Sequence, residues 1–181
     1  MAARRLARIG GWTAVVTAAL LAGCAPKRPA PPPPTPVVPA PPPAAALDPE
    51  SYMAFTASSA LFAVQSSRMA EARGSTARIK KFASQVVMDQ TGIGAQLSFA
   101  GRYIDLLPSS RLLPEHQAML DRLAASADLG GTYKAQLAKV LREAAAAHRA
   151  FEARGDSPTL RPVARFAAPV CEKNLAALRK L

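Results

Sequence analysis

From Leu47 to the end of the chain, apolar and polar side chains recur at the helical spacing of three or four residues. Asp48, Pro49 and Glu50 are typical of a helix start, because they supply a capping side chain, a proline for the first helical position and an acid near the positive end. Gly74 should end this helix. Its inward stripe consists of apolar or small residues: Tyr52, Phe55, Ser59, Phe62, Ser66 and Met69.

A second helix is predicted between Ser75, which should cap it, and Pro108, before which it should end. Three glycines, Gly92, Gly94 and Gly101, fall inside this helix and weaken it, so that a kink can form there. The inward stripe of the second helix is Ile79, Phe82, Val86, Asp89, Ile93, Leu97 and Ile104.

Pro114 should open a shorter third helix, which Gly130 and Gly131 are expected to break. A fourth, long helix follows and should stop at Gly155. Its inward stripe is Tyr133, Leu137, Val140, Leu141, Ala144, His148 and Phe151.

Ser157 and Pro158 should start a further helix, which Pro169 interrupts before a final helical segment over residues 170–181. No part of the chain alternates with the period of a strand. Short connections between amphipathic helices therefore predict one all-α domain, residues 47–181, built as an antiparallel bundle.

The first part of the chain has a different character. MAARRLARIGG forms a positive n-region, and WTAVVTAALLAG forms an apolar h-region that is too short to span a bilayer permanently. The run LAGC, which ends at Cys24, resembles the lipobox of bacterial lipoproteins, in which the cysteine thiol receives diacylglycerol. Residues 1–23 are therefore predicted to be a lipoprotein signal peptide, and Cys24 the lipidated N-terminus. The alternatives are an ordinary secreted protein cleaved near Ala25 and a retained anchor.

Lipidation would hold the chain on a membrane, because each buried methylene contributes about 0.8 kcal/mol and several acyl chains hold firmly. The lipoprotein resemblance implies that the cysteine carries two or three such acyl chains, of the palmitate type. In lipoproteins of this kind an aspartate after the cysteine often marks retention in the inner membrane. Ala25 occupies that position here. The sequence therefore favours the periplasmic face of the outer membrane over the inner membrane.

Residues 25–46 contain 11 of the 17 prolines of the chain. Such a tract cannot pack a core or sustain a helix, and it favours extended polyproline II. At roughly 3.1 Å per residue, the tract reaches up to about 70 Å. Residues 24–46 are therefore predicted to be a lipidated cysteine followed by a spacer that holds the helical domain away from the membrane. A role of the prolines as a PxxP ligand is the alternative.

The net charge is +11 for the whole chain, and it falls to +6 for residues 47–181. One interpretation is a solvated basic surface. The other is attraction to anionic lipid headgroups or to other anionic envelope polymers. A nucleic acid partner is not predicted, because the export signal takes the chain away from the cytoplasm.

Lipidation of Cys24 would leave Cys171 as the only thiol, so no intramolecular disulfide is expected. Cys171 lies among helical residues and is expected to be a small buried side chain. Catalytic use of this thiol would need a base, and His148 is the candidate in the same half of the chain. Asp89 is the one carboxylate on a predicted core stripe, so two facing acids are not expected. We therefore expect no enzymatic activity and no cofactor.

Other ring side chains are expected to have structural roles. Tyr103 and Tyr133 should pack between helices rather than bind a ligand. His116 falls in the first turn of the third helix, where it should face water. Gly92 and Gly94 are a bare pair of glycines in a helix and make no phosphate loop. The chain contains neither HExxH nor GxSxG.

Several segments resemble a ferritin-like family of unknown function that is found in bacterial predicted outer-membrane proteins. The resemblance covers about residues 50–178 and implies an antiparallel ferritin-like four-helix bundle with a short extra C-terminal helix. It depends on IKKFASQVVMDQT (79–91), LPEHQAMLDRLAASA (113–127), Tyr133 and GDSPTLRPVARFAAPVCEKNLAAL (155–178).

Families of this kind suggest a metal site, because carboxylates and imidazoles that project inward from several helices chelate transition metals. Asp89 matches an acid of the family, and His148 shares an inward stripe with Phe151, so these two are the candidate ligands. The competing interpretation is a buried hydrogen-bonded pair, or His148 at an edge facing water. No metal site is predicted, since the other ligand positions of the family carry Ala63, Gln90, either Ala144 or Leu141, and Asn174 here.

The leading hypothesis is an envelope lipoprotein that presents a non-catalytic helical bundle in the periplasm, with a binding, spacer or stress-related role. The membrane is the expected partner through the N-terminal lipid, and an anionic envelope polymer or a partner protein is a second. One alternative is a metal-binding ferritin-like bundle. Another is a module that binds anionic envelope surfaces.

Overall fold

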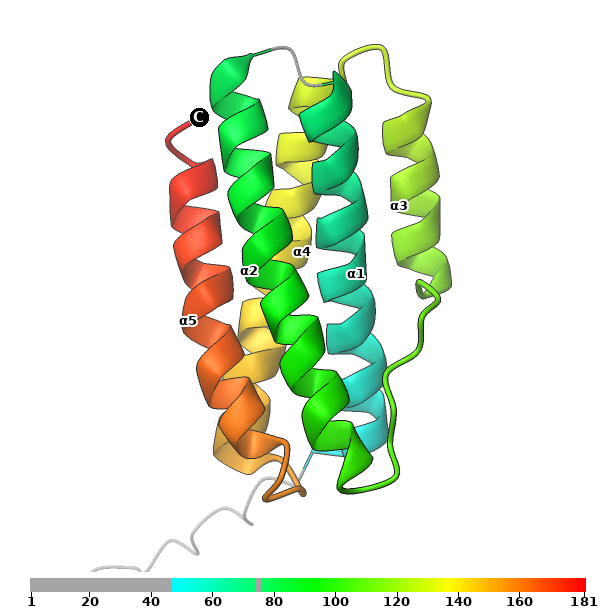
Figure 1. Cartoon of the computed structure of the whole chain (residues 1–181), viewed down its shortest axis with the longest axis vertical. Coiled ribbons are helices and arrows are strands. Elements are labelled where there is room, and N and C mark those ends of the chain that lie inside the picture. Colours follow the sequence, from blue (N-terminus) through cyan, green and yellow to red (C-terminus); the bar gives the residue numbers. More distant parts are fainter. Residues whose placement is uncertain (1–46, 74–75) are drawn as a thin grey trace, which may run out of the picture. The chain divides into compact units, whose positions relative to one another are not determined.

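The structure of the chain is a computed structural model, which describes residues 47–73 and 76–181. The predicted signal peptide, Cys24 and the proline-rich spacer lie outside the described residues. The described residues form five α-helices and no strand, and none of these helices is long and apolar enough to cross a membrane. The helices, labelled in Figure 1, are α1 (Pro49–Arg73), α2 (Ala77–Arg102), α3 (Pro114–Ala124), α4 (Leu129–Arg154) and α5 (Arg161–Leu178).

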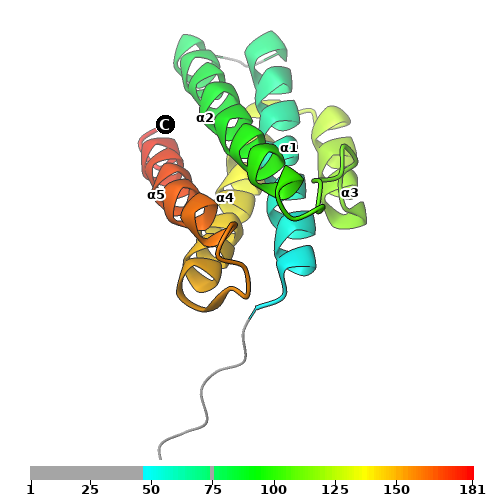
Figure 2. The same cartoon turned by 60° about the horizontal axis from the view of Figure 1, so that its bottom comes forward.

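The four long helices form the bundle, and the short α3 lies on its outer side, from which Leu123 reaches the main core (Figure 1 and Figure 2). The closest packing joins α1 to α2 and α4 to α5, while contacts of α1 with α4 and of α2 with α5 close the ring. α3 packs against α1 and α4. The predicted all-α class is confirmed for the described residues. The expected short C-terminal helix was wrong, because the short helix is α3, with 11 residues, whereas α5 has 18.

α1 has neighbours on three sides, since it contacts α2, α3 and α4. Three of its buried hydroxyl groups, those of Thr56, Ser59 and Ser66, bond back to carbonyls of their own helix. Thr56 Oγ1 donates to the carbonyl of Tyr52 at 2.7 Å, and Ser59 Oγ donates to the carbonyl of Phe55 at 2.8 Å. Because these hydroxyls are satisfied within the helix, α1 can be enclosed without leaving them unpaired.

The chain joins the bundle beside the C-terminal end of α4. The Leu47 N–H donates to the carbonyl of Arg154 at 2.9 Å, and the Asp156 N–H donates to the carbonyl of Leu47 at 3.0 Å. Leu47 and Gly155 thereby form an isolated parallel bridge. This bridge fixes the point at which the residues before Leu47 are attached, namely the end of the bundle where α1 begins and α4 ends (Figure 1).

α2 ends at Arg102, before Pro108 as predicted, but also before Ile104, which had been placed on its stripe. The carbonyl of Gly101 accepts a hydrogen bond from the Leu106 N–H at 2.9 Å, and Asp105 adopts a φ of 53°. The left-handed residue and this bond turn the chain out of the helix axis. The apolar periodicity of the sequence continues through the turn, so it did not indicate the end.

Two helix starts differ from the prediction. Thr76 caps α2 in place of Ser75, because its hydroxyl accepts a hydrogen bond from the backbone of the first turn. Gly130 and Gly131 lie in the first turn of α4 and do not end α3. The Asp128 carboxylate caps α4 by accepting from the Gly131 N–H at 2.9 Å. A Cβ at Gly131 would lie 2.1 Å from that carboxylate, so the glycine makes room for the cap.

α5 begins at Arg161, after the start predicted at Ser157 and Pro158. The Ser157 hydroxyl instead accepts from the Leu160 N–H at 3.2 Å and stabilises a turn that precedes the helix. Pro169 was expected to interrupt the last helix, and this was wrong, because α5 continues through it. It is exposed, so water can reach the carbonyl that loses its helical donor there, and the buried residues on either side hold the two halves in one helix.

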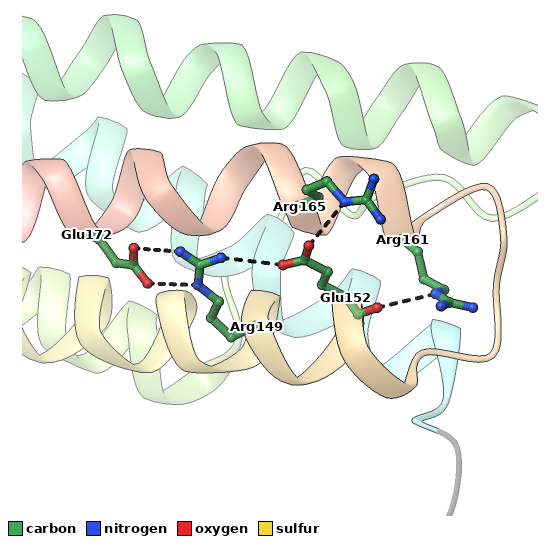
Figure 3. Close-up of polar contacts among 5 residues, drawn as sticks. All are labelled: Arg149, Glu152, Arg161, Arg165 and Glu172. Carbon is green, nitrogen blue, oxygen red and sulfur yellow. Dashed lines mark hydrogen bonds and ion pairs between the residues drawn. The ribbon is translucent and has the colours of Figure 1, made fainter.

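A network of charged residues joins α4 to α5 on the surface (Figure 3). The Arg149 guanidinium donates to both carboxylate oxygens of Glu172, at 2.9 and 2.8 Å, and these bonds hold the pKa of Glu172 below its ordinary value. Glu152 accepts from Arg149 at 3.4 Å and from Arg165 at 3.1 Å, and the Arg161 side chain donates to its carbonyl at 3.3 Å. Because the network is exposed, salt should weaken it.

Candidate functional site

His148 lies in the core on α4, where its stripe predicted it, with 1% of its surface exposed. Its Nδ1 is 2.9 Å from the hydroxyl of Tyr52 on α1, whose ring stacks on Phe151. Burial lowers the pKa of His148 to about 4 and raises the pKa of Tyr52 above its ordinary value. The two side chains are therefore neutral at pH 7, and their hydrogen bond links α1 to α4 inside the core.

Asp89 lies on α2 at the edge that meets α5, and its predicted place in the core was wrong. Its Oδ1 accepts a hydrogen bond from the Gln85 Nε2 at 2.9 Å, and its Oδ2 lies 3.6 Å from the Lys173 Nζ. The side chain of Asp89 is 17% exposed and that of Lys173 is 67% exposed. The next residue, Gln90, points inward instead, because one position along a helix rotates the side chain by about 100°.

The structure gives the two candidate ligands separate partners. Asp89 bonds to Gln85 and pairs with Lys173, whereas His148 bonds to Tyr52. Among the described residues, no group of three or more His, Cys, Asp or Glu side chains is placed to hold a metal ion. The residues with buried polar side chains include no carboxylate: Thr56, Ser58, Ser59, Ser66, Ser67, Gln90, His116, His148, Ser157 and Asn174. This donor set does not fit a ferritin-like metal centre.

Two ligand positions of the resembled family carry buried amides. The Gln90 Nε2 lies 3.8 Å from the Cys171 Sγ, across the contact of α2 with α5. Cys171 is fully buried, as expected, and burial raises its pKa to about 11, so that it stays a protonated thiol. The Asn174 Nδ2 has no hydrogen-bond partner among the described residues. Within the described core, the Gln90–Cys171 contact connects α2 to α5, and the two positions supply amides in place of imidazole or carboxylate ligands.

His116 is buried, so the expectation that it faces water was wrong. Its Nδ1 lies 2.7 Å from the Ser58 Oγ, which also accepts from the Leu113 N–H at 2.8 Å. The rings of Phe55 and Phe62 flank the imidazole, and burial lowers its pKa. A first-turn position suggested exposure, but α3 lies against α1 and encloses that turn. The serine and histidine attach α3 to α1 and, being buried, are not placed to meet a substrate.

The two tyrosines that were expected to pack between helices differ in burial. Tyr133 is fully buried, and its hydroxyl lies 2.8 Å from the Ser67 Oγ, which links α4 to α1. Tyr103 is 70% exposed, so the expectation for it was wrong. It follows the end of α2 and contacts the exposed ring of Phe99, with ring centroids 5.2 Å apart. The turn at Gly101 explains the difference, because it takes Tyr103 off the helical stripe.

The Asp89–Lys173 pair should contribute little to stability. A double-mutant cycle of Asp89→Asn and Lys173→Gln is expected to give a coupling of about 1 kcal/mol or less, because the lysine is well exposed. Urea unfolding followed by circular dichroism measures the cycle. A matched cycle on the exposed pair Lys139–Glu143 should give a similar value. A coupling of several kcal/mol at Asp89 would show that its carboxylate has a larger role.

A family model described as a domain of unknown function (DUF4142) matches residues 34–181. The match covers most of the chain, including every described residue, and it begins inside the predicted spacer. No curated protein and no solved structure gives a significant match. The comparisons therefore group the chain with a family and provide no ligand, reaction or partner.

Proposed function

We propose that this chain, which belongs to the DUF4142 family of domains of unknown function, is an envelope lipoprotein that presents a non-catalytic helical bundle in the periplasm. One observation supports the non-catalytic role most directly. The buried polar side chains of the described core are neutral and are largely used in hydrogen bonds within or between helices. Such bonds fix the arrangement of the helices and leave no activated nucleophile facing a groove.

The anchor is supported by the sequence. The run LAGC follows a basic n-region and an apolar h-region, and it ends at the thiol of Cys24 that would receive the lipid. The spacer of residues 25–46 then leads to Leu47, at the end of the bundle where α1 begins. With Ala25 after the cysteine, the periplasmic face of the outer membrane is the proposed location. The bundle would serve there in binding, in spacing or in a stress response.

We propose further that the four long helices form an antiparallel ferritin-like bundle, with α3 in the connection between α2 and α4. The pairing of α1 with α2 and of α4 with α5 supports this topology. A metal centre does not follow from it, because Gln90 and Asn174 occupy positions where the resemblance implies an imidazole. The metal-binding alternative therefore has no donor set in its favour among the described residues.

The lipid anchor can be tested in cells grown with labelled palmitate. The wild-type chain is expected to carry the label and to fractionate with membranes. Cys24→Ser is expected to carry none, because serine lacks the thiol that forms the thioether. Cys171→Ala is the matched control, since it removes the other cysteine and should leave labelling unchanged. Label on Cys24→Ser, or its absence from the wild type, would contradict the anchor.

Metal analysis of the purified chain tests the non-catalytic role. After dialysis, transition metal is expected well below one equivalent, because the described core offers no set of three anionic or imidazole ligands. Stoichiometric iron, zinc or manganese that disappears in Asp89→Asn or His148→Gln would instead support the metal-binding alternative.

A further inference from the structure

A groove of about 530 Å³ lies between the first turns of α2 and the last turns of α5. Its size is within the range of small-molecule sites. None of the core pairs described above lies in it. We call it the basic groove and define it by the cations on its rim, Arg78, Lys81, Lys173 and Lys180, and by Phe82 and Ala177 on its apolar floor.

The side chains that line the basic groove include four cations, the amide of Gln85 and no carboxylate. The Lys173 Nζ forms an ion pair with the Asp89 Oδ2 at 3.6 Å. None of the ion pairs of the described residues involves Arg78, Lys81 or Lys180. The Arg78 guanidinium donates to the carbonyl of Lys180, which holds one end of the rim in place. α2 begins here with no acid in its first turn, so the positive end of the helix adds to the same field.

The floor of the basic groove is apolar. Phe82 is nearly buried beneath it, and Ala176 and Ala177 bring no polar side chain to it. A small inorganic anion would be held by the rim and would leave this floor in contact with water. An amphiphile with an anionic head matches both parts, because its head can meet the cations while its hydrocarbon chain covers the floor.

The basic groove lies far from the point where the chain joins the bundle. Figure 1 and Figure 2 show the start of α2 and the end of α5 at one end of the bundle, and the start of α1 at the other. α1 has 25 residues and is about 37 Å long, so it sets the scale of this separation. A tether that reaches Leu47 is therefore attached at the end of the bundle opposite to the groove.

We propose that the basic groove binds an amphiphile whose phosphate head carries a net negative charge, with the phosphate at the rim and an acyl chain along Phe82 and Ala177. The chemistry follows from the groove itself. Only the place where the ligand would be met, the envelope, rests on the proposed function.

The test uses the chain from residue 24 to residue 181 with Cys24→Ser, which keeps the whole compact unit from Pro42 to Leu181. It is titrated calorimetrically with a short-chain phosphatidic acid below its micelle concentration. Saturable binding that weakens as salt rises is expected. Short-chain phosphatidylcholine and inorganic phosphate should each bind at least about tenfold more weakly, because one lacks net charge and the other lacks the chain.

Paired variants locate the site. Lys81→Gln with Lys180→Gln removes two rim charges and should weaken binding about tenfold or more. Lys80→Gln with Arg179→Gln is the matched control, since it removes the same charge at adjacent exposed positions outside the groove lining and should change affinity less than about twofold. Ala176→Glu should abolish binding by placing a carboxylate in the groove. Unchanged circular dichroism spectra establish that the variants fold.

Each opposing result has a distinct meaning. Equal losses in the two paired variants would replace the groove by diffuse positive charge and overturn the proposal. Equal binding of inorganic phosphate would make it a plain anion site, and equal binding of phosphatidylcholine would remove the role of the net negative charge of the head. Both would overturn it as well. Because lipid labelling at Cys24 is measured separately in cells, failure of the anchor and failure of the groove can be told apart.

Discussion

Gly101→Ala is expected to lower the free energy of unfolding by about 2–3 kcal/mol, although alanine is the better helix former. A Cβ at this position would lie 2.2 Å from the carbonyl oxygen of Leu106 and 3.3 Å from the Met53 Cε. The first of these atoms is backbone, so it cannot move without opening the turn that ends α2. That turn also holds Asp105 in its left-handed conformation. Urea unfolding followed by circular dichroism measures the loss.

The same substitution at two other positions of α2 provides the control. A Cβ on Gly92 or on Gly94 would meet no atom within 4 Å. Gly92→Ala and Gly94→Ala should therefore each raise the free energy of unfolding by about 0.5–1 kcal/mol, because alanine loses less backbone entropy in a helix. A stabilising Gly101→Ala would show that the turn after α2 is looser than described.

The stability of the bundle is expected to fall by about 3 kcal/mol between pH 6.5 and pH 4 through His148 alone. Burial lowers the pKa of this imidazole from its ordinary 6.5 to about 4 in the folded chain. Within that window the unfolded chain binds a proton that the folded chain does not. Stability therefore rises with pH across the window and is lost as pH falls. His116, whose pKa is also lowered by burial, adds an effect of the same sign.

His148→Gln isolates this contribution. Glutamine does not titrate in the window, and it can still form a hydrogen bond with the Tyr52 hydroxyl, so the variant should show a flatter dependence of unfolding free energy on pH between 4 and 6.5. The comparison needs urea unfolding of both chains at several pH values, since the carboxylates titrate in both. Parallel curves for the two chains would show that burial does not lower the pKa of His148.

Periodicity predicted which helix faces are buried more accurately than it predicted single polar residues. His148 and Tyr133 lie inside, as their stripe on α4 indicated. On α2 the stripe included Asp89, but the residue that faces the core is Gln90. A rotation of about 100° separates neighbours on a helix, and both residues are polar, so hydropathy could not decide between them.

The other differences from the prediction depend on contacts between residues that are far apart in the sequence. The burial of His116 depends on Ser58 and the two phenylalanines of α1, and nothing within α3 signals it. The continuity of α5 through Pro169 depends on the buried side of the helix packing against α4 and α2. The basic groove was not predicted either, because its cations come from α2 and α5, which are far apart in the sequence.

The sequence by itself determined that the described part of the chain is helical, where α1 and α3 begin, where α1 and α4 end, and that its inner faces are rich in small apolar side chains. These properties are local, since caps, prolines and 3.6-residue periodicity act within one helix. Only the tertiary structure decided which helices are neighbours, that Asp89 and His148 have separate partners, and that four cations gather over an apolar floor. Those outcomes depend on how one helix is rotated against another, and packing of the whole core sets that rotation.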